Sequence, residues 1–361
     1  MKIVTIIGAR PQFIKSAIVS HNFAQASSIK EIVIHTGQHF DSNMSDIFFL
    51  ELGITNPKYN LGIGGGLHGA MTGAQLAGIE DILIKESPHL VLVYGDTNST
   101  LAGALAASKL HIPVAHVEAG LRSFNRKMPE EINRVVTDHI SDILFAPTDT
   151  AVSHLKNEGV PKEKIYQVGD VMFDAALFYG KQAEATSNIL IQLGLRSKSY
   201  ILTTVHRAEN TDNLSRLKNI ILALAEASQS LPVIWPLHPR TRQLISKHNL
   251  EGLLKKNVHL IDPVGYLDMV MLEQNAAVIA TDSGGVQKEA FFYRVPCVTL
   301  RDETEWVELV DAKWNTLVPP LDADVISQSI VKAIGTQGNS IAPYGDGAST
   351  KRISEIILSL K

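Results

Sequence analysis

The sequence has little of several features that would each indicate a particular class of protein. Its 361 residues include a single cysteine, Cys297, so no disulfide can form within the chain. Aromatic residues make up only 6%, and 33 Lys and Arg stand against 37 Asp and Glu, so the basic, aromatic composition of a nucleic-acid-binding surface is missing. No apolar run approaches the roughly 18 residues of a membrane-spanning helix, and the N-terminal apolar run is too short for a signal peptide. We therefore expect a cytoplasmic protein that binds neither nucleic acid nor membrane.

What is present is enough apolar sequence for a large core. Hydrophobic residues make up 45% of the chain and the mean hydropathy is +0.07, which allows two domains of roughly 150 to 200 residues each. Short apolar runs alternate with stretches of helical spacing, a pattern that predicts parallel, doubly wound sheets. The expected strands are 3–7, 31–35, 90–94, 114–117, 143–146 and 165–168, and then 200–205, 233–237, 258–261, 278–281 and 297–300.

These two series of strands predict an α/β protein with two Rossmann-like domains. We expect the first domain to cover residues 1–168 and the second to cover residues 169–348, with the final helix, 349–361, packing back on the first domain. The polar, irregular stretch 180–198 is the best candidate for a linker.

The most informative segment is 281–290, which turns a strand-like apolar run into a helix through two adjacent glycines. With Ser283 as the N-cap, Gly284 and Gly285 let the backbone approach an anion, and the N–H groups of the first turn point at it. Glu289 follows within two turns, close enough to accept hydrogen bonds from a ribose attached to that anion. An ordinary capped helix is the alternative for this motif taken alone.

Charged residues also follow several strands of the first series, where ligands bind in open α/β sheets. The first strand runs into a glycine turn with Arg10 and Lys15, two cations suited to a diphosphate. Asp96, Glu118 and Glu130 follow later strands at consecutive positions. Solvated loop acids are the alternative for each one alone, but three together indicate acid and base catalysis, since close carboxylates separate their pKa values.

In the second series, His206 and Arg207 follow one strand and His238 follows the next. We expect His206 to be functional, whereas a core histidine is the alternative for His238. The segment 64–69 fits the G-x-G-x-x-G pattern but follows a poor strand, so it predicts a loop rather than a dinucleotide site. Neither a cysteine pair nor an H-E-x-x-H motif is present, and we expect no metal site.

Seven motifs in order resemble the non-hydrolysing UDP-N-acetylglucosamine 2-epimerases over nearly the whole chain. They are Gly8-x-Arg-Pro, Gly95-Asp-Thr, His116-Val-Glu-Ala-Gly-Leu-Arg122, Pro129-Glu-Glu-x-Asn-Arg134, His206-Arg-x-Glu209, Asp282-Ser-Gly-Gly285 and Tyr344-Gly-Asp-Gly347. The resemblance implies a fold of the glycosyltransferase-B type, with two Rossmann-like domains facing a cleft, and a homodimer. It also implies a UDP-sugar substrate and no nicotinamide or other cofactor.

The resemblance further implies a role for each matching residue. Asp96, Glu118, Glu130 and His206 match the family's catalytic positions, and the UDP contacts are Arg10, Lys15, Ser283, Gly284, Gly285 and Glu289. Further sugar or phosphate contacts are Arg134, Arg207 and His238. The implied reaction eliminates UDP together with the proton on C2, gives a 2-acetamidoglucal, and adds both back with the proton on the other face. Which carboxylate serves which face stays open.

Some positions depart from the plain pattern of the family. Gln12 and Phe13 follow Arg10-Pro, Trp306 stands within Thr304-Glu-Trp-Val-Glu308, and Asp41 ends the segment 36–41. These changes resemble the branch acting on UDP-2,3-diacetamido-2,3-dideoxy-glucuronate in O-antigen synthesis, and Asp41 leaves activation by a second UDP-sugar open. The alternatives are a hydrolysing epimerase and a glycosyltransferase with a UDP-sugar donor.

Overall fold

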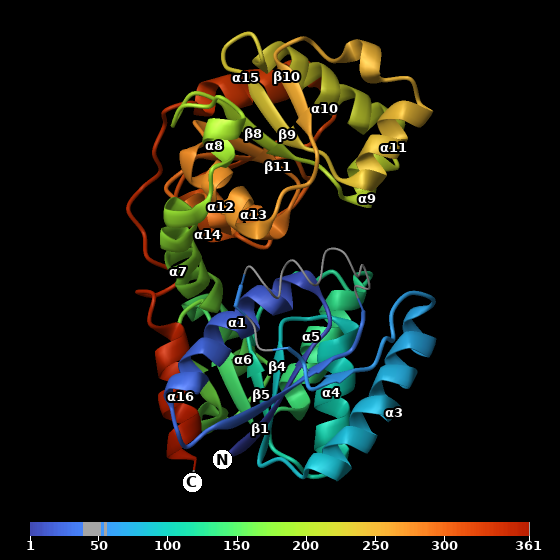
Figure 1. The fold of residues 1–361 in the computed structure, drawn as a ribbon, viewed down its shortest axis with the longest axis vertical. Helices are drawn as coiled ribbons and strands as arrows, with labels where there is room; N and C mark the ends of the chain where they lie inside the picture. The colour runs from blue at the N-terminus through green and yellow to red at the C-terminus, as the bar shows by residue number, and fades with distance from the viewer. Residues whose placement is uncertain (39–51, 54–55, 361) are drawn as a thin grey trace. The chain divides into compact units, whose positions relative to one another are not determined.

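The computed structural model describes residues 1–38, 52–53 and 56–360 (Figure 1). The chain divides into two compact units. Unit 1 comprises Met1–Phe178 and Ala342–Lys361, and unit 2 comprises Tyr179–Ile341. Within the described ranges no helix is long and apolar enough to cross a membrane.

Unit 1 is built on a seven-stranded sheet in the order β3-β2-β1-β4-β5-β6-β7. Its described strands pair in parallel throughout. Their bounds are β1 (Lys2–Ile7), β2 (Lys30–His35), β3 (Tyr59–Asn60), β4 (Leu90–Tyr94), β5 (Val114–Val117), β6 (Ile143–Ala146) and β7 (Ile165–Gln167). The helices are α1 (Arg10–Gln25), α3 (His68–Glu86), α4 (Asn98–Lys109), α5 (Pro129–Ile140), α6 (Asp149–Asn157) and the 3-10 turn η1 (Lys162–Lys164).

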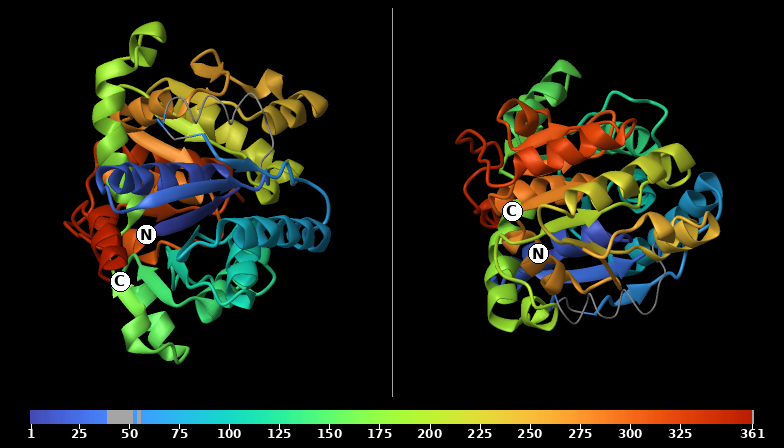
Figure 2. Two further views of the ribbon diagram at one scale, coloured as in Figure 1. Left: turned by 60° about the horizontal axis from the view of Figure 1, so that its bottom comes forward. Right: turned by 90° about the horizontal axis from the view of Figure 1, so that it is seen from above.

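The C-terminal helix belongs to unit 1. Helix α16 (Ser349–Ser359) packs along α1, and the two chain termini lie close together in every view (Figures 1 and 2). Its first turn is held by Asp174, whose carboxylate accepts the backbone N–H groups of Ser349 and Thr350 at 3.1 and 2.8 Å. Asp174 lies in α7 (Val171–Thr186), the helix in which the chain passes from unit 1 to unit 2.

Unit 2 repeats this architecture with a six-stranded parallel sheet in the order β10-β9-β8-β11-β12-β13. The strands are β8 (Ile201–Thr204), β9 (Val233–Pro236), β10 (Val258–Ile261), β11 (Val278–Thr281), β12 (Cys297–Thr299) and β13 (Asn315–Leu317). The longer helices are α10 (Leu214–Ala227), α11 (Pro239–Lys247), α12 (Tyr266–Asn275), α13 (Gly284–Phe292) and α15 (Ala323–Ala333). Short segments complete the unit: α8 (Ile189–Gln192), α9 (Ala208–Thr211), η2 (Glu251–Leu253) and α14 (Val307–Asp311).

The sequence-based expectation for residues 180–198 was wrong in its first half. Helix α7 continues to Thr186 through Gly180, and α8 follows at Ile189. Glycine suits this helix interior because a methyl group on Gly180 would lie 2.6 Å from the side-chain amide nitrogen of Gln274 in α12. A glycine in a sequence often indicates the end of a helix. Here close packing between α7 and α12 explains Gly180 instead.

Candidate functional site

Each unit places its candidate residues at the point where the strand order of its sheet reverses. In unit 1 the chain leaves β1 toward β2 and leaves β4 toward β5, in opposite directions, so the carboxyl ends of β1 and β4 border a crevice. The adjacent strands β8 and β11 do the same in unit 2. Arg10 and Asp96 follow β1 and β4, and His206 and Ser283 follow β8 and β11.

Two ion pairs gather in unit 1 around the turn that follows β4. Asp96 is paired with Arg134 of α5, and Glu118, which follows β5, is paired with Lys15 of α1. A methyl group on Gly95 would lie 3.4 Å from a Glu118 carboxylate oxygen and 3.6 Å from the Lys15 ammonium nitrogen. The second pair therefore lies directly against the turn that carries Asp96. Lys15, which we expected to contact UDP, lies in one of these two ion pairs.

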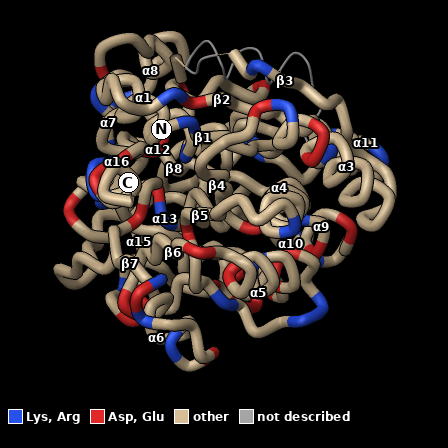
Figure 3. The backbone as a smooth tube through the Cα atoms, turned by 90° about the horizontal axis from the view of Figure 1, so that it is seen from below, with Lys and Arg blue, Asp and Glu red and all other residues tan. Residues whose placement is uncertain are grey.

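The carboxylates around Arg134 favour the charged form of its guanidinium group. Burial works against the charged form of Arg134, but Asp96, Glu131 and Glu118 together raise the pKa of the Arg134 guanidinium above its ordinary value. An arginine that stays charged favours the ionised carboxylate beside it. Figure 3 shows acidic and basic residues interspersed along the described backbone.

The backbone at Glu118 adopts a conformation that residues other than glycine rarely take. Its φ is +76°, between Gly95 at +63° and Gly120 at +82° on the neighbouring turns. The N–H of Glu118 donates to the carbonyl of Phe145 at 3.1 Å, which helps to hold this geometry. A glutamate kept in the left-handed region costs about 1–3 kcal/mol and is typical of functional sites.

Glu130 differs from the other two carboxylates. It lies exposed in the first turn of α5 and, among the described residues, is not part of the two ion pairs. Its neighbour Glu131 is buried and accepts the N–H groups of Ser123 and Phe124, both at 2.9 Å. Although burial opposes it, these hydrogen bonds lower the pKa of Glu131, which therefore anchors the loop before α5 as a carboxylate.

In unit 2 a buried carboxylate arranges the histidine loop. Asp282 is fully buried and accepts the backbone N–H groups of His206 and Arg207, at 3.1 and 3.0 Å, and the side-chain amide of Asn210 at 3.1 Å. His206 is exposed, and its ring lies 6.0 Å from that of His238, centroid to centroid. His238 is also exposed and caps α11 by accepting the N–H of Arg240, so it is not a core histidine. Sequence reasoning missed Asp282 as an anchor, although its place directly after β11 was visible.

Helix α13 begins where the glycine motif predicts. Ser283 occupies the N-cap position, but its side chain makes no capping hydrogen bond. Neither Gly284 nor Gly285 has a positive φ, and a methyl group would lie 3.9 Å from Glu305 on the first and 3.8 Å from Glu289 on the second, at ordinary contact distance from these described side chains. The packing and backbone of the chain therefore do not require glycine at these two positions. Glu289, one turn later, is buried, and its carboxylate faces Gly285.

Trp306 lies beside the start of α13. Its indole N–H donates to the carbonyl of Gly284 at 2.9 Å, and the Lys288 ammonium group stacks 4.2 Å from its ring. Arg301 is buried nearby and donates two hydrogen bonds to the carboxylate of Glu305, at 2.9 and 3.1 Å. The substituted tryptophan is thus placed next to the candidate phosphate site.

The other two substituted positions are core residues and are not presented to a ligand. Gln12 is 1% exposed: its carbonyl oxygen accepts the N–H groups of Gly8 and Ala9, and its amide donates to Tyr94 and Thr100. Phe13 is 2% exposed. Both side chains are buried, and the expectation that they lie near the sugar stays a prediction. His39, Phe40 and Asp41 lie outside the described residues.

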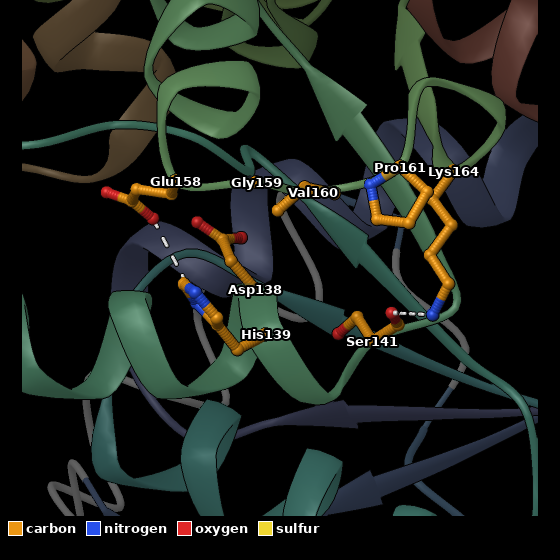
Figure 4. A pocket seen from close by; sticks show the side chains of 8 residues that line it. All are labelled: Asp138, His139, Ser141, Glu158, Gly159, Val160, Pro161 and Lys164. Atoms are coloured by element: carbon orange, nitrogen blue, oxygen red, sulfur yellow. Dashed lines mark hydrogen bonds and ion pairs between the residues drawn. The ribbon is translucent and has the colours of Figure 1, made fainter.

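A cavity of about 190 Å³ in unit 1 is separate from these groups (Figure 4). Its lining includes residues that directly precede β6 and β7, so it lies at the amino ends of these strands, whereas Asp96 and Glu118 lie beyond carboxyl ends. The lining residues are Asp138, His139, Ser141, Glu158, Gly159, Val160, Pro161 and Lys164. Over the ranges that the structure describes, no group of three or more His, Cys, Asp or Glu residues is arranged to hold a metal ion.

Comparisons with known proteins agree on one family. A family model described as UDP-N-acetylglucosamine 2-epimerase matches residues 21–358. A UDP-2,3-diacetamido-2,3-dideoxy-D-glucuronate 2-epimerase of Pseudomonas aeruginosa is 55% identical, with all of both chains covered. A UDP-N-acetylglucosamine 2-epimerase homolog of Methanococcus maripaludis is 56% identical, also over the full length of both. The crystal structure of Methanocaldococcus jannaschii UDP-GlcNAc 2-epimerase in complex with UDP-GlcNAc and UDP is 47% identical, with a TM-score of 0.90, and covers 99% of this chain and 100% of that one.

Proposed function

This chain belongs to the UDP-N-acetylglucosamine 2-epimerase family and is therefore an isomerase, and we propose that it inverts C2 of a UDP-linked N-acetylhexosamine by eliminating and re-adding UDP. The proposal includes the residues that carry the reaction and the identity of the sugar. The observation that carries it is the pairing of Asp96 and Glu118 with cations at the carboxyl ends of β4 and β5.

The nucleotide binds at the start of α13. The two glycines there serve no packing need of the chain, which supports a role in admitting a ligand to the backbone. The N–H groups of the first turn then donate to diphosphate oxygens, and the helix dipole favours their negative charge. Ser283 adds its unused hydroxyl, Glu289 accepts from the ribose, and Arg10 adds positive charge.

The reaction needs a leaving group and two proton transfers. The bond between C1 and the diphosphate oxygen breaks with its electron pair going to UDP, a base takes the proton from C2, and a double bond forms between C1 and C2. The 2-acetamidoglucal then receives a proton on the opposite face of C2 while a diphosphate oxygen attacks C1. Because the two proton transfers occur on opposite faces, they need two groups, for which we propose Asp96 and Glu118, with Glu130 as the alternative for either.

The departing diphosphate needs stabilisation while it is not bonded to the sugar. His206 is exposed at the end of β8 and is kept there by the hydrogen bond from its backbone N–H to Asp282. We assign it to the diphosphate, with Arg207 and His238 as further contacts. Arg134 is paired with Asp96 and so holds its carboxylate in place.

We propose that the sugar is 2,3-diacetamido-2,3-dideoxy-glucuronate, as in the Pseudomonas aeruginosa relative. The support is the identity of 55% over the full length and the place of Trp306, one of the positions that depart from the plain family pattern, against Gly284. Such a substrate enters the pathway of a cell-surface polysaccharide such as O-antigen, in the cytoplasm.

Specificity constants for the two sugar nucleotides test this assignment. We expect kcat/KM for the diacetamido-uronate to exceed that for UDP-GlcNAc by about 10²-fold or more, because a site built to pair a carboxylate and a second acetamido group rejects a substrate without them. Equal or better turnover of UDP-GlcNAc would assign the chain to the plain UDP-GlcNAc epimerases.

We further propose that the protein is a homodimer. Unit 1 carries exposed apolar side chains on or beside two helices of one layer, at Leu67, Ile84, Ile132 and Val136. Exposed apolar surface of this kind is typical of an association site. Sedimentation equilibrium gives the mass directly, and a monomer at assay concentration would reject the dimer.

A further inference from the structure

His116 is a fully buried histidine in β5 that the proposed reaction does not use. Its Nε2 lies 2.7 Å from the carbonyl oxygen of Gly95, and its Nδ1 lies 2.7 Å from a carboxylate oxygen of Asp138 in α5. Gly95 directly precedes Asp96. The histidine thus joins the turn that carries a proposed catalytic acid to the body of a helix.

The partners of His116 determine its charge. A backbone carbonyl oxygen can only accept a hydrogen bond, so Nε2 must carry a hydrogen. The other oxygen of Asp138 accepts the N–H of Gly120 at 3.0 Å and a guanidinium N–H of Arg122 at 2.7 Å. Since Asp138 is surrounded by donors, it is a carboxylate, and Nδ1 must carry a hydrogen as well.

Charge balance supports this assignment. Asp138 is buried, and although burial disfavours its charge, His116 and Arg122 lower the pKa of the Asp138 carboxyl group. Arg122 in turn donates to both oxygens of Glu158 in α6, at 2.7 and 2.6 Å. With His116 as an imidazolium, the buried Asp138 and the partly exposed Glu158 are matched by two positive charges, whereas a neutral His116 would leave Arg122 as their shared partner.

The same contacts hold three turns of unusual backbone. Gly95, Glu118 and Gly120 all have positive φ, and His116 and Asp138 bond to the first and the last of them. Asn133, one helical turn before Asp138 in α5, donates to the carbonyl of Asp96 at 2.9 Å. The positions of Asp96 and Glu118 relative to each other therefore depend on this buried network.

We propose that His116, held as an imidazolium by Asp138, is a positioning residue that fixes the Gly95–Asp96 turn against Glu118 for the two proton transfers. This role rests on the proposed function, whereas the doubly protonated ring does not. The charged groups that face the ring or its partners are Asp138 of α5, Arg122 of the loop after β5, Glu158 of α6, and the Glu118–Lys15 pair beside Gly95.

Nitrogen-15 NMR of histidine-labelled protein tests the charge without any assay of activity. The signals of His116 are assigned as those that disappear in His116→Gln. We expect both of its ring nitrogens to appear as N–H groups, each correlated with a proton protected from exchange. A single N–H with one unprotonated nitrogen would overturn the imidazolium. Because this result needs no turnover, it stands even if the wild-type protein proves not to epimerise a UDP-sugar.

Two substitutions at His116 test the positioning role. The amide nitrogen of asparagine replaces Nδ1 and can reach only Asp138, whereas that of glutamine replaces Nε2 and can reach Gly95. We expect His116→Asn to lower kcat by about 10²-fold with KM and UDP affinity unchanged, as for a misplaced catalytic group, and His116→Gln to recover at least about tenfold of that loss.

Glu158→Gln provides the matched control, because Glu158 reaches the network through Arg122 and makes no hydrogen bond to His116, Asp138 or Gly95 among the described contacts. We expect it to lower the melting temperature as much as His116→Asn does, with kcat close to that of the wild type. If both variants lose kcat in proportion to their loss of stability, or if His116→Gln is no better than His116→Asn, then His116 is only structural and the proposal is wrong.

Discussion

Asp96 and Glu118 are both ion-paired, but their partners come from different parts of the chain. Arg134 reaches Asp96 from α5, and Lys15 reaches Glu118 from α1. Each carboxylate is therefore held from a different helix, which fixes the two proposed acid and base groups independently. Glu130, exposed in the first turn of α5, has no such pairing among the described contacts, and its carboxylate is better placed to exchange protons with solvent.

Substitution of Asp96 tests the role assigned to it. We expect Asp96→Asn to lower turnover by roughly 10²- to 10⁴-fold, because the amide can neither take nor return a proton. UDP affinity should change little, since the proposed nucleotide contacts on α13 are untouched. Turnover by NMR and UDP titration by calorimetry measure the two effects, with Asp149→Asn, an exposed aspartate in α6, as the control. Near-normal turnover of Asp96→Asn would remove this residue from the acid and base groups.

The sequence was enough to identify candidate residues at strand ends. It was not enough to identify their ion-pair partners. Lys15 and Glu118 are 103 residues apart and are adjacent only because β1 and β5 flank β4 in the sheet. Gln12 and Phe13 were expected near the sugar because they differ from the family pattern. A difference in sequence does not report burial, and both face the core.

At the scale of elements, α5 and α13 organise the two parts of the candidate site. Helix α5 presents Asn133, Arg134 and Asp138 to the ends of β4 and β5, and Arg134 and Asp138 are four residues, about one helical turn, apart. Helix α13 instead offers its N-terminus, where backbone N–H groups are available to the proposed ligand.

The glycine at the start of α13 allows a direct test of nucleotide binding. We expect Gly284→Leu to weaken UDP binding by about 10- to 100-fold, the effect of losing one charge-assisted hydrogen bond of about 1.5–3 kcal/mol. The folded state should tolerate the first carbon of the side chain, because a methyl group on Gly284 would lie 3.9 Å from Glu305 and 4.0 Å from Trp306, at ordinary contact distance. Gly252→Leu is the control for replacing a glycine away from α13, since a methyl group on that glycine, in η2, would meet no described atom within 4 Å. Equal affinity of both variants for UDP would show that UDP does not bind on α13.

Most strands were predictable from apolar runs. The exceptions are β3 (Tyr59–Asn60) and β13 (Asn315–Leu317), which include polar residues and are too short to show a pattern. The polar surface of α7 after Gly180 looked like a linker because a solvated helix face and a loop have the same composition. Only the packing of Gly180 on Gln274 distinguishes them.

At the scale of the whole molecule, two doubly wound units hold different candidate groups. Unit 1 holds the paired carboxylates Asp96 and Glu118, and unit 2 holds helix α13 with its two glycines and the histidines His206 and His238. The alternation of strands and helices was enough to predict this class of fold, and parallel strands bring the ends of distant motifs to one edge of a sheet. The seven motifs then identified the family that the comparisons established.

Epimerisation in D2O tests the central claim most directly. If the enzyme removes the C2 proton and returns one from an exchangeable carboxyl group, both the product and the recovered substrate should gain deuterium at C2, with UDP still attached to the sugar. Proton NMR of the UDP-sugar, either UDP-GlcNAc or its diacetamido-uronate relative, follows C2 and the anomeric signal in one experiment. Inversion at C2 with the original proton retained, or release of free sugar and UDP as the only products, would contradict the account.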